Sequence, residues 1–326
     1  MTFGELRLAI CVFENKRLHF SGRLFKISHT GRVNMTVRRA TIDDVPHIVD
    51  LSEKKRTQYE QFQPLFWRKA KDSREKQTPF FTNMLQNEDM LMLVHEEAGG
   101  IDGFIIANLR QGRPCGVDDF AVADEIMWDT VGKALLQSAG TAAQKRGTTK
   151  YDVVCGHLDQ PKRAMLHDMG LTIERYWYTA AINVDASHTF VVRKAVLADA
   201  VHIAQVAGHP ERAFPEIERE NTIVLVCENE GALLGYAIAL VIQTPPVYDP
   251  GGPTCSVIES VVAKPDFWST AGGALLNGIQ NEALKQDAVQ IVVICEAQNL
   301  AKQQALQDYG LTIASEWFVG KITPRT

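Results

Sequence analysis

The sequence lacks the patterns that mark membrane, disulfide-rich and nucleic-acid-binding proteins. Its apolar stretches, such as the one around Leu233–Ile242, are shorter than the roughly 18 residues that suggest a membrane span. The six cysteines form no CxxC pair, which indicates neither a disulfide framework nor a zinc site. The net charge of −5 leaves no general excess of Lys and Arg for phosphate backbones. We therefore expect no metal, no membrane and no nucleic-acid partner; a reducing cytoplasm fits best, and the oligomeric state stays open.

The first 34 residues also lack the apolar core and the small-residue cleavage site of a secretory signal. They carry six Lys or Arg residues against two Asp or Glu residues. A folded domain begins at Met35, which is followed by TVRRATIDDVPHI. We expect residues 1–34 to be an upstream extension or the product of a mis-assigned start, either not native or disordered.

Internal repetition is the strongest pattern in the chain. Its 326 residues suggest about two domains, and a content of 45% hydrophobic and 22% charged residues is typical of globular proteins. WDTVGKALL begins at Trp128 and WSTAGGALL at Trp268, 140 residues later, and the same offset relates Cys155 to Cys295. Residues 37–48 resemble residues 192–203 at an offset of 155. The pattern indicates a tandem duplication, with one domain over 35–186 and a second over 187–326.

Each copy alternates strand and helix patterns in the same order. A short strand leads into an apolar-periodic helix, then a pair of apolar strands with a turn that contains Gly, and then a further strand. A helix follows at about 130–145 and 270–285, and the copy ends with a strand, a helix closed by Gly170 or Gly310, and a last strand. This order predicts an α+β, or α/β layered, domain with a mixed central sheet flanked by helices.

The order of elements resembles the GNAT superfamily of acyl-CoA N-acyltransferases in tandem, over roughly residues 35–322. FAVADEIMWDTVGKALL (120–136) and SVVAKPDFWSTAGGALL (260–276) resemble the family's strand–loop–helix that holds the pyrophosphate of acyl-CoA. The backbone N–H groups and the dipole of a helix start attract phosphate. The resemblance implies acetyl-CoA, or another acyl-CoA, as cosubstrate.

The family's phosphate loop is only partly kept. Its Gln or Arg is absent from both copies, and Thr130 and Thr270 replace its first Gly, while Gly132 and Gly272 keep its last small residue. A capped, well-packed helix start without a ligand is the alternative interpretation. The resemblance assigns cofactor contacts to Thr130, Val131, Gly132 and Lys133 in the first copy, and to Val262, Ser269, Thr270, Ala271, Gly272, Gly273 and Asn299 in the second.

The two loops differ in charge. Asp129 places a carboxylate in the first loop, where it should repel phosphate, although Lys133 partly offsets it. The second loop is uncharged and small, which makes the second copy the better predicted CoA site. The preceding Trp128 and Trp268 are read as shared core positions rather than ligand contacts.

Acyl transfer to an amine needs a group that removes the amine proton and one that protonates the leaving thiolate. Asp119 and Glu259 occupy matching positions on the strand that supplies this base in many GNAT enzymes, although a solvent-facing acid is an equal alternative. The family's proton-donating Tyr is replaced by Leu166 and Leu306, so the leaving-group acid is not identified. His157, His167 and Tyr309 lie nearby in the sequence but match no family position.

The acceptor side is predicted from the first helices of copy one. Tyr59, Phe66 and Trp67 lie there among many charges and are candidate substrate-binding residues, with packing of a helix on the sheet as the alternative. The leading hypothesis is an N-acetyltransferase for a small-molecule amine, with inactivity of one or both domains as an open alternative. A catalytically inactive CoA-binding module and a structural scaffold are the competing functions.

Overall fold

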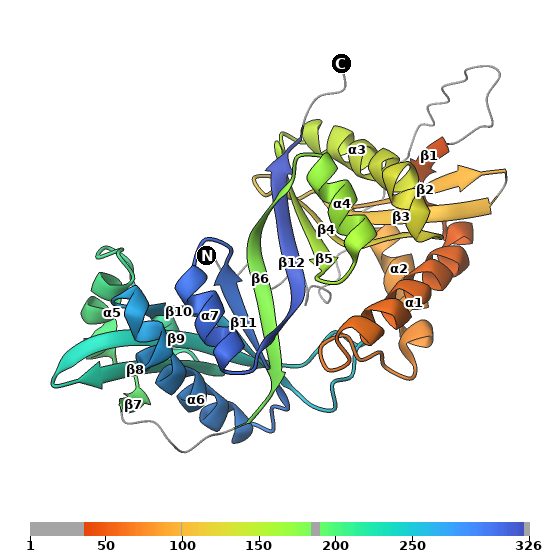
Figure 1. The fold of residues 1–326 in the computed structure, drawn as a ribbon. Helices are drawn as coiled ribbons and strands as arrows, with labels where there is room; N and C mark the ends of the chain where they lie inside the picture. The colour runs from red at the N-terminus through yellow and green to blue at the C-terminus, as the bar shows by residue number, and fades with distance from the viewer. Residues whose placement is uncertain (1–35, 99, 184–189, 323–326) are drawn as a thin grey trace. The chain divides into compact units, whose positions relative to one another are not determined.

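The computed structural model describes residues 36–98, 100–183 and 190–322. The prediction for residues 1–34 lies outside the described residues. Within this part of the chain, each repeat forms the predicted alternation of strands and helices (Figure 1). No described helix is long and apolar enough to cross a bilayer.

The two repeats share one order of strands and helices, except that the second has a 3-10 helix (Pro215–Glu218) where the first has α2. The first repeat contains β1 (Thr36–Arg39), α1 (Val45–Phe62), α2 (Ser73–Leu85), β2 (Met90–Glu97), β3 (Gly100–Asn108), β4 (Cys115–Val122), α3 (Val131–Gln144), β5 (Lys150–Gly156), α4 (Gln160–Asp168) and β6 (Thr172–Ala181). The second contains β7 (Val191–Lys194), α5 (Ala200–Val206), β8 (Thr222–Asn229), β9 (Ala232–Ile242), β10 (Thr254–Val262), α6 (Ala271–Leu284), β11 (Gln290–Glu296), α7 (Leu300–Asp308) and β12 (Thr312–Lys321).

One compact unit of the chain comprises the described residues of 36–54, 77–153 and 320–322. Its strands follow the order β1-β2-β3-β4-β5, antiparallel except for the parallel pair β4 and β5. Val45, Ile48 and Phe81 pack from the helices onto Val94 and Phe104 of the sheet. Burial of this apolar face is what holds helices α1 and α2 on the strands.

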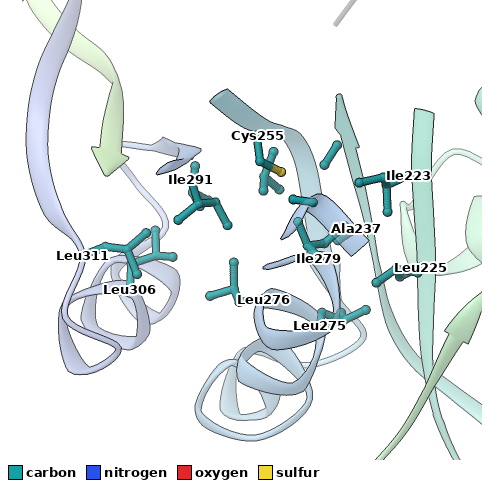
Figure 2. Packing of buried hydrophobic residues seen from close by; sticks show 14 of the residues in the cluster. Ile223, Leu225, Ala237, Cys255, Leu275, Leu276, Ile279, Ile291, Leu306 and Leu311 are labelled. Carbon is teal, nitrogen blue, oxygen red and sulfur yellow. The ribbon is translucent and has the colours of Figure 1, made fainter. Parts of the chain in front are cut away.

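The other compact unit comprises 55–76 and the described residues of 154–319. Its strands follow the order β12-β6-β11-β10-β9-β8-β7, antiparallel except for the parallel pair β10 and β11. Figure 2 shows the core of this unit, where Ile279 of α6 lies beside Ala237 of β9 and Leu275 lies beside Leu225 of β8. The apolar positions at helical spacing are therefore core positions, as their periodicity predicts.

Strand β6, the last of the first repeat, lies between two strands of the second repeat. It pairs antiparallel with β11, where Trp177 is opposite Ile294, and with β12, where Tyr176 is opposite Glu316. Trp177 and its repeat mate Trp317 stack at a centroid distance of 5.2 Å. Periodicity predicts that each of these strands exists but not which partner it pairs with. The extents of the two folding domains, 35–186 and 187–326, stay a prediction.

The cysteines of the described chain are buried free thiols. Burial raises the pKa of both Cys155 and Cys295 to about 12. A thiol with so high a pKa is a poor nucleophile near neutral pH. The two thiols are therefore core residues, as their place in apolar strands predicts.

Candidate active site

The parallel strands β10 and β11 part beside a bulge in the second repeat. Their ladder runs only from Thr254 to Val257 on β10, although β10 continues to Val262. At the same point the register with β9 shifts between Val257 and Glu259, so Ile258 is an extra residue. A bulge bends its strand and re-aims the next side chains. The segment 258–262 is therefore not paired with β11, and Glu259 stands at its beginning.

The first repeat has the same combination of a bulge and a short parallel ladder. The ladder of β4 with β5 covers Cys115 to Val117 only. The register of β4 with β3 shifts so that Asp118 and Asp119 together stand opposite Ile106. Asp119, the predicted base of this copy, is half-buried at the bulge. Two bulges at equivalent positions make the parted strands a property of the repeat.

Glu259 is held by two side chains that the sequence does not single out. Arg212 Nη1 donates to Glu259 Oε1 at 2.7 Å, and Tyr236 Oη donates to the same oxygen. Burial, together with this hydrogen bond, raises the pKa of Tyr236 well above its usual range, so the phenol keeps its proton. Both donors use Oε1. Arg212 and Tyr236 lie 47 and 23 residues from Glu259, with no motif that links them.

The second helix start combines exposed hydroxyls with N–H groups that precede the first turn of hydrogen bonds. Ser269 and Thr270 are exposed, and Thr270 Oγ1 donates to Phe267 O at 3.4 Å instead of capping the helix. The first hydrogen bond of α6 runs from Ala274 N to Thr270 O at 3.0 Å. The N–H groups of the residues between them point along the helix axis, as at any helix start. The exposed side of this start fits a phosphate group.

The two glycines of this loop contact aromatic rings of the protein itself. A Cβ at Gly272 would lie 2.6 Å from Trp268 Cε3, and one at Gly273 would overlap Tyr309 Oη. Trp268 is 4% exposed, which confirms the core interpretation, whereas Tyr309 is 38% exposed. Small residues are therefore required here by ring packing, and Tyr309 covers one side of the helix start.

The first helix start carries an ion pair. Lys133, in the first turn of α3, pairs with Asp129 four residues earlier. Val131 and Gly132 are buried, and Thr130 is exposed. The cation thus neutralises the carboxylate that the sequence places there.

Trp128 of the first repeat, like its mate in the second, belongs to the core. It is 2% exposed and packs edge-on against Phe120 at 4.8 Å.

Asn299 caps a helix. Its Oδ1 accepts a hydrogen bond from Lys302 N at 3.1 Å, and Val262 is buried near the same helix, beside Trp268 and Ala305. The first-repeat mate, Asp159, caps α4 in the same way. The family's Asn position is therefore occupied by a helix cap in both copies.

The predicted acceptor residues meet in one aromatic cluster of the second unit. Trp67 contacts Tyr59 at 5.2 Å and Phe66 at 4.6 Å between ring centroids. Phe66 also meets Trp177 at 6.3 Å, and Trp67 meets Tyr248 at 5.4 Å. We name these residues and Trp317 the aromatic cluster. The sequence predicts only Tyr59, Phe66 and Trp67 as members. The others come from the paired strands β6 and β12 and from the 244–250 loop.

Two nearly buried arginines lie on rings of the aromatic cluster. The Arg56 guanidinium is 5.5 Å from the centroid of Tyr248, and that of Arg175 is 5.2 Å from Trp317. Their exposed fractions are 5% and 7%. Such cation–π contacts place positive charge beside a half-buried apolar surface.

Two of the histidines named from the sequence have structural partners. His157 Nδ1 lies 2.6 Å from Oε1 of the fully buried Glu316, which also accepts from Arg163 Nε at 2.7 Å. His167 packs edge-on against Phe318 at 5.0 Å. Neither contact involves the second helix start.

Solved structures of N-acetyltransferases resemble the chain. One is a GCN5-related N-acetyltransferase from Sphaerobacter thermophilus, with a TM-score of 0.55 and 14% identity over 90% of this chain and 97% of that one. Another contains the GCN5-related glucosamine N-acetyltransferase region of a fungal multi-domain β-N-acetylglucosaminidase, with a TM-score of 0.54 and 10% identity over 89% and 38% of the two chains. A tandem GNAT protein from the clavulanic acid biosynthesis pathway matches at a TM-score of 0.48 and 15% identity, over 90% and 100% of the two chains.

No family model and no curated protein sequence matches the chain. The structural likeness nevertheless establishes the fold, which is that of the GCN5-related N-acetyltransferases. It confirms the predicted class of mixed sheets flanked by helices, in tandem.

Proposed function

We propose that the protein is an acyl-CoA-dependent N-acyltransferase that transfers an acetyl group to the amine of a small molecule. The observation that carries the proposal is the parting of β10 from β11 beside the start of α6. In this arrangement a strand edge, a helix start that would bind phosphate and a carboxylate belong to one stretch of chain. Fold alone does not determine activity, so the proposal depends on these residues.

The second repeat would hold the acyl donor. The helix start at 269–273, where Ser269 and Thr270 are exposed and residues 271–273 are buried, would bind its pyrophosphate. Val262 lies on the strand that leads back from there to Glu259. A donor bound at the helix start must lie along 259–262 for its thioester to reach Glu259. The backbone edge of this segment is not paired with β11.

Glu259 would take the proton of the acceptor amine. Arg212 and Tyr236 fix its carboxylate through Oε1, so we assign Oε2 to the acceptor. A fixed carboxylate within reach of the amine meets the geometric requirement for a general base. When bound, acyl-CoA supplies the activated acyl group that the amine attacks.

The aromatic cluster would bind the acceptor. Phe66, Trp67 and Tyr248 are half-buried, and two arginines lie on its rings. This chemistry suits an amine with an apolar or aromatic body, such as an aromatic amino acid. Buried free thiols agree with a cytoplasmic location for the reaction.

A catalytically inactive CoA-binding protein is the second candidate. The ring of Tyr309 over Gly273 favours it, because the ring narrows access to the helix start.

Acetyl-CoA incubated with phenylalanine, tryptophan and a panel of aliphatic amines distinguishes the two candidates. We expect free thiol and an acetylated amine, detected by mass, in equal amounts. Calorimetric binding of acetyl-CoA without turnover on any amine would support the inactive binding protein instead, and absence of binding would contradict both.

A further inference from the structure

Lys302 is a buried cation beside 258–262, the segment of β10 that is not paired with β11. It lies on α7, is 1% exposed, and its Nζ donates to Ser260 O at 3.4 Å. Ser260 belongs to the segment 258–262 that β11 does not pair with. Its ammonium also lies 5.2 Å from the centroid of Trp268 and 3.8 Å from Glu296 Oε2. A buried ammonium is costly unless it is partnered, and these three groups are partners that the structure gives it.

The position of Lys302 relates it to the missing proton donor. Leu306, where the resembling family has its Tyr, lies one turn further along α7 and is fully buried. Residues four apart lie on the same face of a helix. Lys302 therefore projects from the same face of α7, and its ammonium reaches the strand edge between Glu259 and Val262.

We propose that Lys302 is the acid that protonates the leaving thiolate in the second repeat. The assignment rests on the proposed function, because it needs an acyl donor lying along 259–262. A donor thioester beside Glu259 would bring its sulfur next to Ser260, the residue whose carbonyl Lys302 contacts. An ammonium in a water-poor site stabilises a developing thiolate more strongly than one in water.

The step balances as follows. The amine nitrogen forms a bond to the acyl carbon, and its proton passes to Glu259. The carbon–sulfur bond breaks with its electron pair on sulfur, which takes a proton from the Lys302 ammonium. Solvent returns a proton to Lys302, and Glu259 releases one. The net change converts acyl thioester and amine into amide and thiol.

The first repeat supplies a matched control. Lys162, the mate of Lys302, is also 1% exposed, and its Nζ donates to Val154 O at 2.9 Å on β5. Replacing either lysine by Met removes one buried ammonium and keeps an unbranched chain of similar length. An effect confined to Lys302→Met therefore reports its site rather than the general loss of a buried charge.

Proton release on binding tests the assignment without turnover. Calorimetry of CoA and desulfo-CoA at pH 7, in buffers of different ionisation enthalpy, counts the protons. An ordinary thiol loses its proton near pH 8.5, so free CoA is mostly protonated at this pH. We expect CoA to release ~0.5 proton or more, desulfo-CoA none, and Lys302→Met to abolish the release while Lys162→Met keeps it.

Kinetics provide the second readout. We expect Lys302→Met to lower kcat about 100-fold or more with little change in KM for acetyl-CoA, and Lys162→Met to leave kcat within about threefold. Equal proton release from both variants, or CoA binding without any release, would overturn the role of Lys302 and leave the donor site intact. Failure of CoA to bind the unaltered protein would instead remove the proposed function, and this role with it. A rise in kcat in Lys302→Met would show that Lys302 obstructs the site.

Discussion

The two helix starts, 128–133 and 268–273, have equivalent places in their repeats but different chemistry. The first carries Asp129 paired with Lys133, and the second is uncharged and partly covered by Tyr309. Both follow a bulged strand that parts from its parallel neighbour. Both repeats thus keep the bulge and the parted strands, while the side chains of the two helix starts differ.

The largest expected effect is a loss of stability when the stacked tryptophans on the paired strands β6 and β12 are replaced. Trp317 is 5% exposed and Trp177 is half-buried. We expect Trp317→Ala to lower the free energy of unfolding by about 3–5 kcal/mol and Trp177→Ala by less, because the deeper ring leaves the larger cavity. Urea unfolding of both variants measures the difference. Equal losses would contradict the asymmetry of the stack.

The candidate bases give the sharpest functional comparison. We expect Glu259→Gln to lower kcat about 100-fold, since the variant side chain cannot accept the amine proton. Asp119→Asn should change kcat less than about threefold. Steady-state kinetics with acetyl-CoA and an accepted amine measure both. A larger loss in Asp119→Asn would move catalysis to the first repeat.

Removing the Tyr309 ring, which lies over the second helix start, should increase the affinity for acetyl-CoA. Tyr309→Ala should tighten acetyl-CoA binding about fivefold, because it uncovers the N–H groups of the helix start. Met169→Ala, at the equivalent position of the first repeat, is the control and should leave affinity unchanged. Calorimetric titration measures the two dissociation constants. Weaker binding in Tyr309→Ala would mean that the ring forms part of the site.

The smallest expected effect is on stability, and it comes from an ion pair that is present in both repeats. A hydrogen bond from Arg38 lowers the pKa of Asp44 from 3.8 to about 2, and Arg193 lowers that of Asp199. Since the folded pKa is the lower one, this stabilisation is present above pH ~4 and is lost as the pH falls towards 2. Arg38 is 35% exposed, so solvent screening reduces the contribution of its pair to about 1 kcal/mol.

We therefore expect Asp44→Asn to cost about 1 kcal/mol at pH 7 and almost nothing near pH 2. Asp199→Asn should follow the same trend. Urea unfolding across this pH range measures both, and a cost that persists at pH 2 would show that the carboxylate acts through something other than its charge.

The sequence predicts the repeat, the element types and the core positions, because these depend on local periodicity and on the 140-residue offset. The burial of Trp128 and Trp268 confirms two of the predicted core positions. The position of β6 between two strands of the second repeat could not be predicted, since an apolar strand can pair with strands of either repeat. The partners of Glu259 were missed for the same reason: Arg212 and Tyr236 come from distant elements.

The burial of Lys302 could not be predicted from the sequence, for a different reason. A lysine in a helix normally indicates a solvated face, and only the structure shows that this one is buried.

One titration can show whether the second repeat holds the acyl donor. Thr270 and Thr130 are exposed and equivalent, so a carboxylate at either position reaches its helix start without the ring clash expected at Gly272. We expect Thr270→Glu to weaken acetyl-CoA binding at least about 30-fold and Thr130→Glu to leave it unchanged. Loss of binding in Thr130→Glu, with Thr270→Glu unaffected, would contradict the account.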